Sequence, residues 1–292
     1  MGALLSGQNW ADGLMLGALY AVAGVGFALV WGVLNVINVA QGSMIMVGAY
    51  VTYVLFKGTG LDPYLSLPVS AAALFIFGYL LQRYVINLIV RAPMFMTLLL
   101  TFGVDLVLTV LLLWIFEPTP RQVSPAYARD SLHLAGMVLP VTRVAAFGIA
   151  IAVTGLVWLL LNRTTLGARI RAASMDVQAA QLVGVRIASI YALTFAIAAA
   201  LAGIAGTLIS TTQAFSPNDA PSLTLKAFVV VALGGLGSAW AALAGGLLLG
   251  LAEILGGAWF GVSYSSMISF AILILVLLVR PSGLLGRQSY AG

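Results

Sequence analysis

Charged residues are scarce in this sequence. Only 7% of its 292 residues are Asp, Glu, Lys or Arg, whereas 62% are hydrophobic. A soluble domain carries about 25% charged residues, so this chain has too few to cover a surface that faces water. The bilayer is therefore the solvent that this composition fits.

Other absences exclude several kinds of chemistry. There is no cysteine, and His133 is the only histidine. Disulfides, thiol catalysis and histidine-rich metal clusters are thus excluded, and we expect no metal site. No GxxxxGK[ST] phosphate loop is present, so the chain does not use ATP by the common route. We expect no enzymatic activity and no cofactor on this chain.

Long apolar runs dominate what is present. Residues 13–56 form 44 consecutive positions without a charge, and a transmembrane helix needs about 20. The sequence predicts an all-α polytopic transmembrane bundle of about eight or nine spans, some broken or re-entrant, in a single membrane domain over 1–292. Spans are expected near 13–34, 38–56, 64–82, 94–116, 143–162 and 187–209, with two or three more in 224–279. The stretch 84–91 is too short to span and is expected at the interface.

The loops differ in charge in an alternating pattern. Loops 83–91 and 163–186 and the tail 280–292 sum to +7, whereas 57–62, 117–143 and 210–222 sum to zero. The positive-inside rule then places the first set in the cytoplasm and the N-terminus outside. The external loop 117–142 is expected to hold a small hairpin around Gly136. A cytoplasmic tail requires an odd number of crossings in 224–279. "KAFVVVALGGLGSAW" is then a short span, which gives nine crossings in all, or it is a half-helix that turns back, in which case the tail or the N-terminus is misplaced.

The cytoplasmic loop 163–186 holds a short helical pattern. Asp176 is a good N-cap and Gly184 a good C-cap for the two turns between them. The residues expected on a small apolar face there are Ala179, Ala180 and Val183. Arg169 and Arg171 precede this helix. The pattern indicates either a face that fits a groove in a partner or a plain basic loop at lipid phosphates.

Polar side chains inside the spans need a reason, because they are costly in lipid. The candidates for a polar translocation pathway are Asn35, Asn38, Gln41, Thr97 and Thr101. Three amides in seven residues favour a broken helix at "NVINVAQ". The candidate flexible break in "GGLGS" is Gly234, Gly235 and Gly237, a backbone tolerated at membrane depth only inside protein or a water-filled cavity. Asp105, Glu253 and Lys226 are further polar residues, with interhelical hydrogen bonding as the simple alternative.

Small residues recur four positions apart. Gly13 and Gly17 form one such pair, and Gly246 and Gly250 form another. This spacing lets helices approach closely, so it predicts tight helix seams. No strong internal repeat is visible in the sequence.

Several of these stretches together resemble a known family, over nearly the whole chain. They are "LGALYAVAGVGFALVWGVLNVINVAQGSMIMVGAY", "TLLLTFGV", "GARIRAASMDVQAAQLVGVRIASIYALTFAIAAALAGIAGTL", "KAFVVVALGGLGSAWAALAGGLLLGLAE" and "RPSGLLGR". The chain resembles the permease subunit of bacterial branched-chain amino acid ABC importers, the LivH type. One position departs from the family, because Gln41 stands where "INxAHG" commonly has histidine.

The resemblance implies the function, location and partners. It implies alternating access in the bacterial inner membrane, with a second permease subunit, two cytoplasmic ATPase subunits that bind ATP and Mg, and an extracytoplasmic substrate-binding protein. No nucleic acid is implied; the remaining contacts are the small substrate and membrane lipid. The resemblance also assigns the ATPase-docking segment, in which we place Arg169, Arg171, Asp176, Ala179, Ala180 and Gly184.

Other functions remain open at this stage. Importers of urea or short amides share the architecture. An ion-coupled secondary carrier would need Asp105 or Glu253 as its coupling group. A passive amide channel would need no energy source. Neither of the last two classes has a use for a cytoplasmic docking helix.

Overall fold

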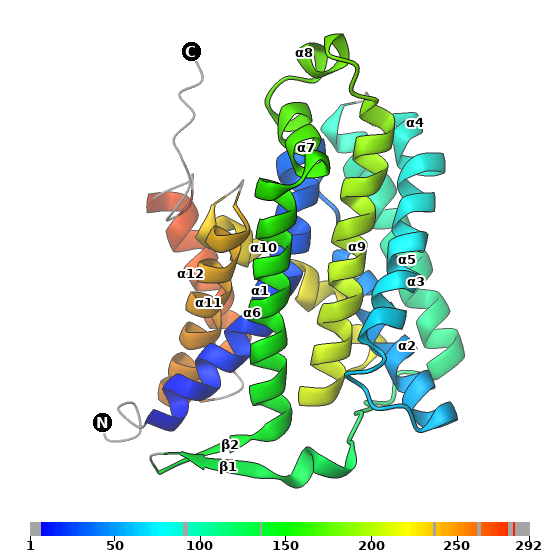
Figure 1. The fold of residues 1–292 in the computed structure, drawn as a ribbon. Helices are drawn as coiled ribbons and strands as arrows, with labels where there is room; N and C mark the ends of the chain where they lie inside the picture. The colour runs from blue at the N-terminus through cyan, green and yellow to red at the C-terminus, as the bar shows by residue number, and fades with distance from the viewer. Residues whose placement is uncertain are drawn as a thin grey trace.

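The computed structural model describes residues 7–89, 93–134, 136–235, 238–261, 264–279 and 283. Figure 1 shows a bundle of roughly aligned helices with the β1–β2 hairpin at one end and α8 at the other. The long helices are α1 (Gly7–Leu34), α5 (Met94–Phe116), α6 (Val141–Arg163), α9 (Ile187–Thr212) and α11 (Ala239–Phe260). The shorter ones are α2 (Gln41–Thr59), α3 (Leu67–Leu81), α4 (Asn87–Ile89), α7 (Thr165–Met175), α8 (Val177–Leu182), α10 (Ala220–Gly234) and α12 (Ser265–Val279).

Six helical segments of the described chain are long and apolar enough to cross a membrane. They are the five long helices and Leu67–Ile89. The shorter α2, α10 and α12 also run lengthwise in the bundle, so the described chain has nine lengthwise helical segments (Figure 1). The all-α membrane bundle is thus confirmed. The segment 224–279 holds three passes, and α10 does not turn back.

One predicted boundary is wrong. The stretch 84–91 is not a separate interfacial segment, because α3 continues through a π-helical turn at Gln82–Ile86 into α4. A π turn absorbs one extra residue without ending the helix. Arg83 therefore lies within one helical segment, which reaches Ile89, the last described residue before position 93.

The structure contains an inverted repeat that the sequence does not reveal. The series α1, α2, α3, α5 recurs as α9, α10, α11, α12 with every direction reversed (Figure 1). In each series a long central helix is followed by a short helix that begins half-way along the bundle. The packing repeats too, since α1 lies along α11 and its counterpart α9 lies along α3. Such repeats are common in membrane transporters.

The predicted small-residue seams are confirmed between α1 and α11. A Cβ on Gly17 would lie 2.6 Å from the carbonyl oxygen of Gly246, and one on Gly250 would lie 2.2 Å from the backbone nitrogen of Gly17. The central helix α9 approaches α2 as closely. A Cβ on Gly206 would lie 2.1 Å from the carbonyl oxygen of Ile45. These helices pack backbone against backbone.

We expect Gly206→Ala to destabilise the protein by about 1–3 kcal/mol, because its methyl group overpacks a rigid backbone contact. Gly148→Ala on α6 is the matched control, since a Cβ there meets nothing within 4 Å. Helix propensity favours that control substitution by up to about 1 kcal/mol. Thermal unfolding of the purified variants in detergent measures both. Equal melting temperatures would contradict the packing described here.

The loop between α5 and α6 forms the predicted hairpin. β1 (Ser131–Leu134) pairs antiparallel with β2 (Met137–Pro140), and Gly136 between them has φ +80°. The loop also packs back onto the bundle. The Tyr127 hydroxyl donates a 2.7 Å hydrogen bond to Asp62, and burial together with this bond raises the pKa of Tyr127 well above its usual range.

Candidate functional site

The polar sequence "NVINVAQ" breaks the helix, as predicted. α1 ends at Leu34, and Asn35 adopts φ +54°, a left-handed conformation that asparagine tolerates. α2 begins at Gln41, whose Nε2 donates to the carbonyl of Ala23 at 3.3 Å. Because Ala23 lies eleven residues before the end of α1, α2 begins about 16 Å inside that end. The chain thus folds back half-way into the bundle before α2 starts.

The five predicted pathway residues separate into two groups. Asn38 and Gln41 are buried, and the Asn38 amide donates to Gln41 at 3.3 Å. Thr101 of α5 joins them, because its Oγ1 accepts from the Val39 nitrogen at 3.2 Å. Thr97 lies one turn away and bonds to the Met94 carbonyl of its own helix. Asn35 is exposed where α1 ends, so the structure does not bring it to this cluster.

The short helix α10 begins close to the point where α2 begins. The Gly42 nitrogen donates to Thr224 Oγ1 at 2.8 Å, and Thr224 Oγ1 lies 3.0 Å from the Val39 carbonyl. A Cβ on Gly42 would lie 1.9 Å from the Ala220 carbonyl oxygen, so only glycine fits there. The N-termini of α2 and α10 therefore meet near the middle of the bundle, where α2 leads to one end and α10 to the other.

We expect Thr101→Val to destabilise this junction by about 1 kcal/mol, because the half-buried Val39 N–H loses its acceptor. Thr97→Val is the matched control on the same helix face, since Thr97 bonds only within its own helix. The melting temperatures of the two purified variants in detergent measure the two effects. Equal losses in both variants would show that the bond between α5 and the break has no special role.

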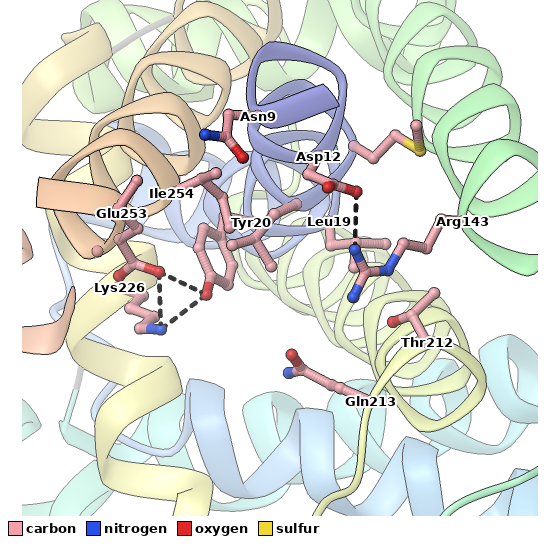
Figure 2. Close-up of a pocket in the computed structure, with 14 residues that line it drawn as sticks. Asn9, Asp12, Leu19, Tyr20, Arg143, Thr212, Gln213, Lys226, Glu253 and Ile254 are labelled. Carbon is pink, nitrogen blue, oxygen red and sulfur yellow. Dashed lines mark hydrogen bonds and ion pairs between the residues drawn. The ribbon is translucent and has the colours of Figure 1, made fainter. Parts of the chain in front are cut away.

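A cavity of about 480 Å³ lies at the end of the bundle that carries the hairpin. It is enclosed by α1, α6, α10, α11 and the end of α9, as Figure 2 shows. Its polar lining residues are Asn9, Asp12, Tyr20, Arg143, Thr212, Gln213, Lys226 and Glu253. Its apolar lining includes Met15, Leu16, Leu19 and Ile254. None of the five predicted pathway residues lines it.

The inner part of this cavity contains an ion pair. Lys226 Nζ lies 3.2 Å from Glu253 Oε2 and 2.7 Å from the Tyr20 hydroxyl, which itself donates to Glu253 at 2.8 Å. Ser269 hydrogen-bonds to the other carboxylate oxygen. The Glu253 side chain is 3% exposed and that of Lys226 is 18% exposed. An ionisable pair this deep in a membrane protein is a functional-site candidate by default.

The mouth of the cavity contains a second ion pair. Arg143 at the start of α6 lies 2.9 Å from Asp12 of α1, and Gln8 donates to the other Asp12 oxygen at 3.0 Å. Gln8 also exchanges hydrogen bonds with Val138 of β2. The hairpin thereby fixes the end of α1 and orients Asp12. The two pairs give the cavity two cations and two anions.

The predicted caps in the loop 163–186 are confirmed. Asp176 accepts hydrogen bonds from the nitrogens of Gln178 and Ala179, and Gly184 ends α8 with φ +85°. The Val185 nitrogen donates to the Ala180 carbonyl at 3.0 Å, which completes a Schellman cap. Arg169 and Arg171 are exposed on α7.

The apolar face predicted on this helix is partly wrong. Ala180 is only 3% exposed because it packs inward, toward the body of the protein. The side chains that α8 and its flanks present to solvent are Met175, Leu182 and Val183, exposed by 87%, 89% and 78%. Ala179 is exposed as well. The outward apolar surface is therefore larger than the sequence suggested, and we call Met175, Ala179, Leu182 and Val183 the α8 surface.

The first two glycines of the glycine-rich segment lie at the end of α10, before α11. Gly234 ends α10, and a Cβ there would lie 2.1 Å from the Ala241 carbonyl oxygen. Gly235 follows with φ +95°, which favours glycine. Gly237 lies outside the described residues. The helix break is present, and its flexibility stays a prediction.

Among the residues that sequence reasoning missed in the cavity, three take part in its ion pairs or bond to them. Tyr20 lies within a long apolar run of the sequence, so no local pattern singles it out. Its role follows from its hydrogen bonds to the buried ion pair. Asp12 and Arg143 lie at span ends, where charges are ordinary. Their pairing joins positions 131 residues apart, which no local pattern predicts.

Comparison with known proteins places this geometry in context. The family described as branched-chain amino acid transport system / permease component matches residues 9–277. The chain is 32% identical to the high-affinity branched-chain amino acid transport system permease protein BraD of Pseudomonas aeruginosa, over 96% of this chain and 95% of that protein. It is 30% identical to LivH of Escherichia coli K12, over 96% and 95%. It is 31% identical to the probable permease LivH of Methanocaldococcus jannaschii, over 92% and 89%.

Proposed function

Because the chain belongs to the permease component family of branched-chain amino acid transport systems, we propose that it forms the membrane pathway of an ATP-driven importer of leucine, isoleucine and valine. The observation that carries this proposal is the family match over 9–277, nearly the whole bundle. The inverted repeat and the two half-helices that meet at its centre support it, since many transporters place substrate sites at such breaks. The chain provides the pathway, and we propose no covalent chemistry for it.

The α8 surface is the proposed docking site for the ATPase subunits. It projects from one end of the bundle (Figure 1). Its apolar side chains Met175, Leu182 and Val183 are exposed by 87%, 89% and 78%. Isolated apolar side chains on a surface are normal, but a group of them on one projecting helix indicates a partner. Arg169 and Arg171 precede it and fit acidic groups on that partner or lipid phosphates.

The orientation follows from charge. We propose that the end with α7 and α8 faces the cytoplasm and the hairpin end faces outward, because the arginine-rich loop 163–186 lies at the former. The membrane is then the bacterial inner membrane. A substrate-binding protein would deliver substrate at the hairpin end, and ATP and Mg would bind to the partner ATPases.

A second permease subunit would complete the assembly. α5 offers a broad apolar surface away from the core, with Phe95, Val107 and Trp114 at 66%, 59% and 82% exposure. Lipid or a second permease covers such a surface. Alternating access then requires motion around the junction of α2, α5 and α10, where Asn38, Gln41 and Thr101 meet.

Mass spectrometry of the proteins that copurify with this chain in mild detergent tests the proposal. We expect two ATPase subunits and a second permease subunit in stoichiometric amounts. We also expect leucine to stimulate ATP hydrolysis when the binding protein is added. A chain that purifies alone, from cells that import leucine through it, would contradict the proposal.

A further inference from the structure

We propose that the cavity between α1, α6, α10 and α11 binds the zwitterionic head group of the amino acid on its way inward. This inference rests on the proposed function and adds a substrate site to it. The site is distinct from the amide cluster at the helix break, because neither Asn38 nor Gln41 lines the cavity.

The first argument is charge. The cavity holds two cations and two anions, so its walls are neutral overall but locally of both signs. An α-amino acid carries one charge of each sign. Its carboxylate can take a place beside Lys226 or Arg143, and its ammonium a place beside Glu253 or Asp12. A ligand with a single charge would instead add a net charge to a site whose own charges are already paired, which is costly.

The second argument is the arrangement of the two pairs. Asp12–Arg143 is the more exposed pair, with side chains 19% and 42% exposed, and it lies beside the hairpin. Lys226–Glu253 is deeper and drier. Figure 2 shows Lys226 and Tyr20 on one side of the cavity and Arg143 and Gln213 across from them. A substrate that enters past the outer pair therefore meets the inner pair next.

The third argument is the donor inventory at the inner pair. A lysine ammonium has three N–H donors. Two of those on Lys226 go to Tyr20 and Glu253, so one is left for a carboxylate. Glu253 differs, since both of its oxygens already accept hydrogen bonds. Lys226 is thus the better first contact, and it would bind the substrate carboxylate.

The fourth argument is the apolar lining. Leu16, Leu19 and Ile254 lie in the same cavity as the charges. Specific small-molecule sites combine apolar walls with a few placed polar groups, and about 480 Å³ is within their usual size. A branched aliphatic side chain fits these walls while the head group meets the ion pairs.

The absence of native cysteine makes the test direct. Leu16→Cys and Ile254→Cys place single thiols in the cavity, and Gly58→Cys places one on the exposed last turn of α2, at the hairpin end, as a control. The permease complex in proteoliposomes, without binding protein, is treated from outside with a membrane-impermeant thiol reagent. We expect millimolar leucine to slow labelling at Leu16→Cys and Ile254→Cys several-fold and to leave Gly58→Cys unchanged. The probes that lack one charge, 4-methylpentanoate and leucinamide, are expected to give no protection.

A charge-free variant identifies the groups responsible. In Lys226→Met/Glu253→Gln, we expect labelling to persist and protection by leucine to be lost. The matched control is Thr52→Val/Thr207→Val, which removes a buried polar pair between α2 and α9 outside the cavity, and protection is expected to survive in it. Equal protection by 4-methylpentanoate, or none by leucine in vesicles that import leucine, would overturn the zwitterion site. Vesicles that fail to import leucine even when ATP and binding protein are supplied would instead overturn the proposed function.

Discussion

Replacing Leu182 with arginine is expected to detach the ATPase subunits and abolish ATP-driven uptake, while the permease itself folds normally. Leu182 is 89% exposed, so the change costs the free permease little. An arginine buried without a partner in an apolar interface costs about 3 kcal/mol or more. Since each 1.4 kcal/mol is tenfold in affinity, ATPase binding is expected to weaken by at least about 100-fold. Quantitative mass spectrometry of the copurified complex measures this.

The control is an equally drastic change at the other end of the molecule. Leu132 on the hairpin is 49% exposed, and Leu132→Arg is expected to keep the ATPases bound. Ala180→Arg is not a clean test of docking, because Ala180 is buried and the change would disturb the loop itself. Full ATPase occupancy in Leu182→Arg would show that α8 is not the docking element.

Replacing Glu253 with leucine alone is expected to destabilise the protein by about 3 kcal/mol. The change leaves the Lys226 charge without its counterion in a largely dry site and removes the acceptor for Tyr20 and Ser269. We place the loss at the low end of the usual range because Lys226 is 18% exposed. Thermal unfolding in detergent and the yield of monodisperse protein measure it.

The double variant separates charge from packing. Lys226→Met/Glu253→Leu removes both charges, and its stability is expected to return to near that of the wild type. Arg143→Gln at the exposed outer pair is expected to cost less than about 1 kcal/mol, as surface ion pairs do. A single Glu253→Leu variant as stable as the double variant would show that the pair is not coupled as described.

The two buried acids have different surroundings. Glu253 accepts hydrogen bonds on both oxygens and is paired with Lys226, so its geometry gives no support to a role as the coupling group of an ion-driven carrier. Asp105 of α5 is 7% exposed, and its Oδ1 has no hydrogen-bond partner in the described part of the chain. Asp105 is therefore the residue to change if uptake proves independent of ATP.

Local chemistry predicted the features that depend on neighbouring residues. Continuous apolar runs located the spans, and for α5 both ends agree with 94–116. Asp176 and Gly184 identified the ends of α8, because caps depend on a few adjacent residues. The amides of "NVINVAQ" predicted the helix break for the same reason.

Features that depend on packing were not predictable. The π turn at Gln82–Ile86 joins segments that the charge of Arg83 had divided. A helix of two turns does not show which side faces the protein, so Ala180 was placed outward in error. The inverted repeat and the cavity arise from contacts between helices that are distant in the sequence. Lys226 contacts Glu253 and Tyr20 because α10 packs against α1 and α11.

Leucine uptake into proteoliposomes tests the account most directly. The vesicles would contain this chain with its second permease subunit and ATPases, and the binding protein would be supplied outside. We predict that leucine uptake requires ATP on the side of the membrane where the ATPase subunits lie and leucine-loaded binding protein on the other side. Isoleucine and valine are expected to compete with leucine, and Leu182→Arg is expected to abolish uptake. Uptake that continues without ATP, or that Leu182→Arg leaves intact, would contradict the central claim that this chain is a pathway driven through α8 by separate ATPases.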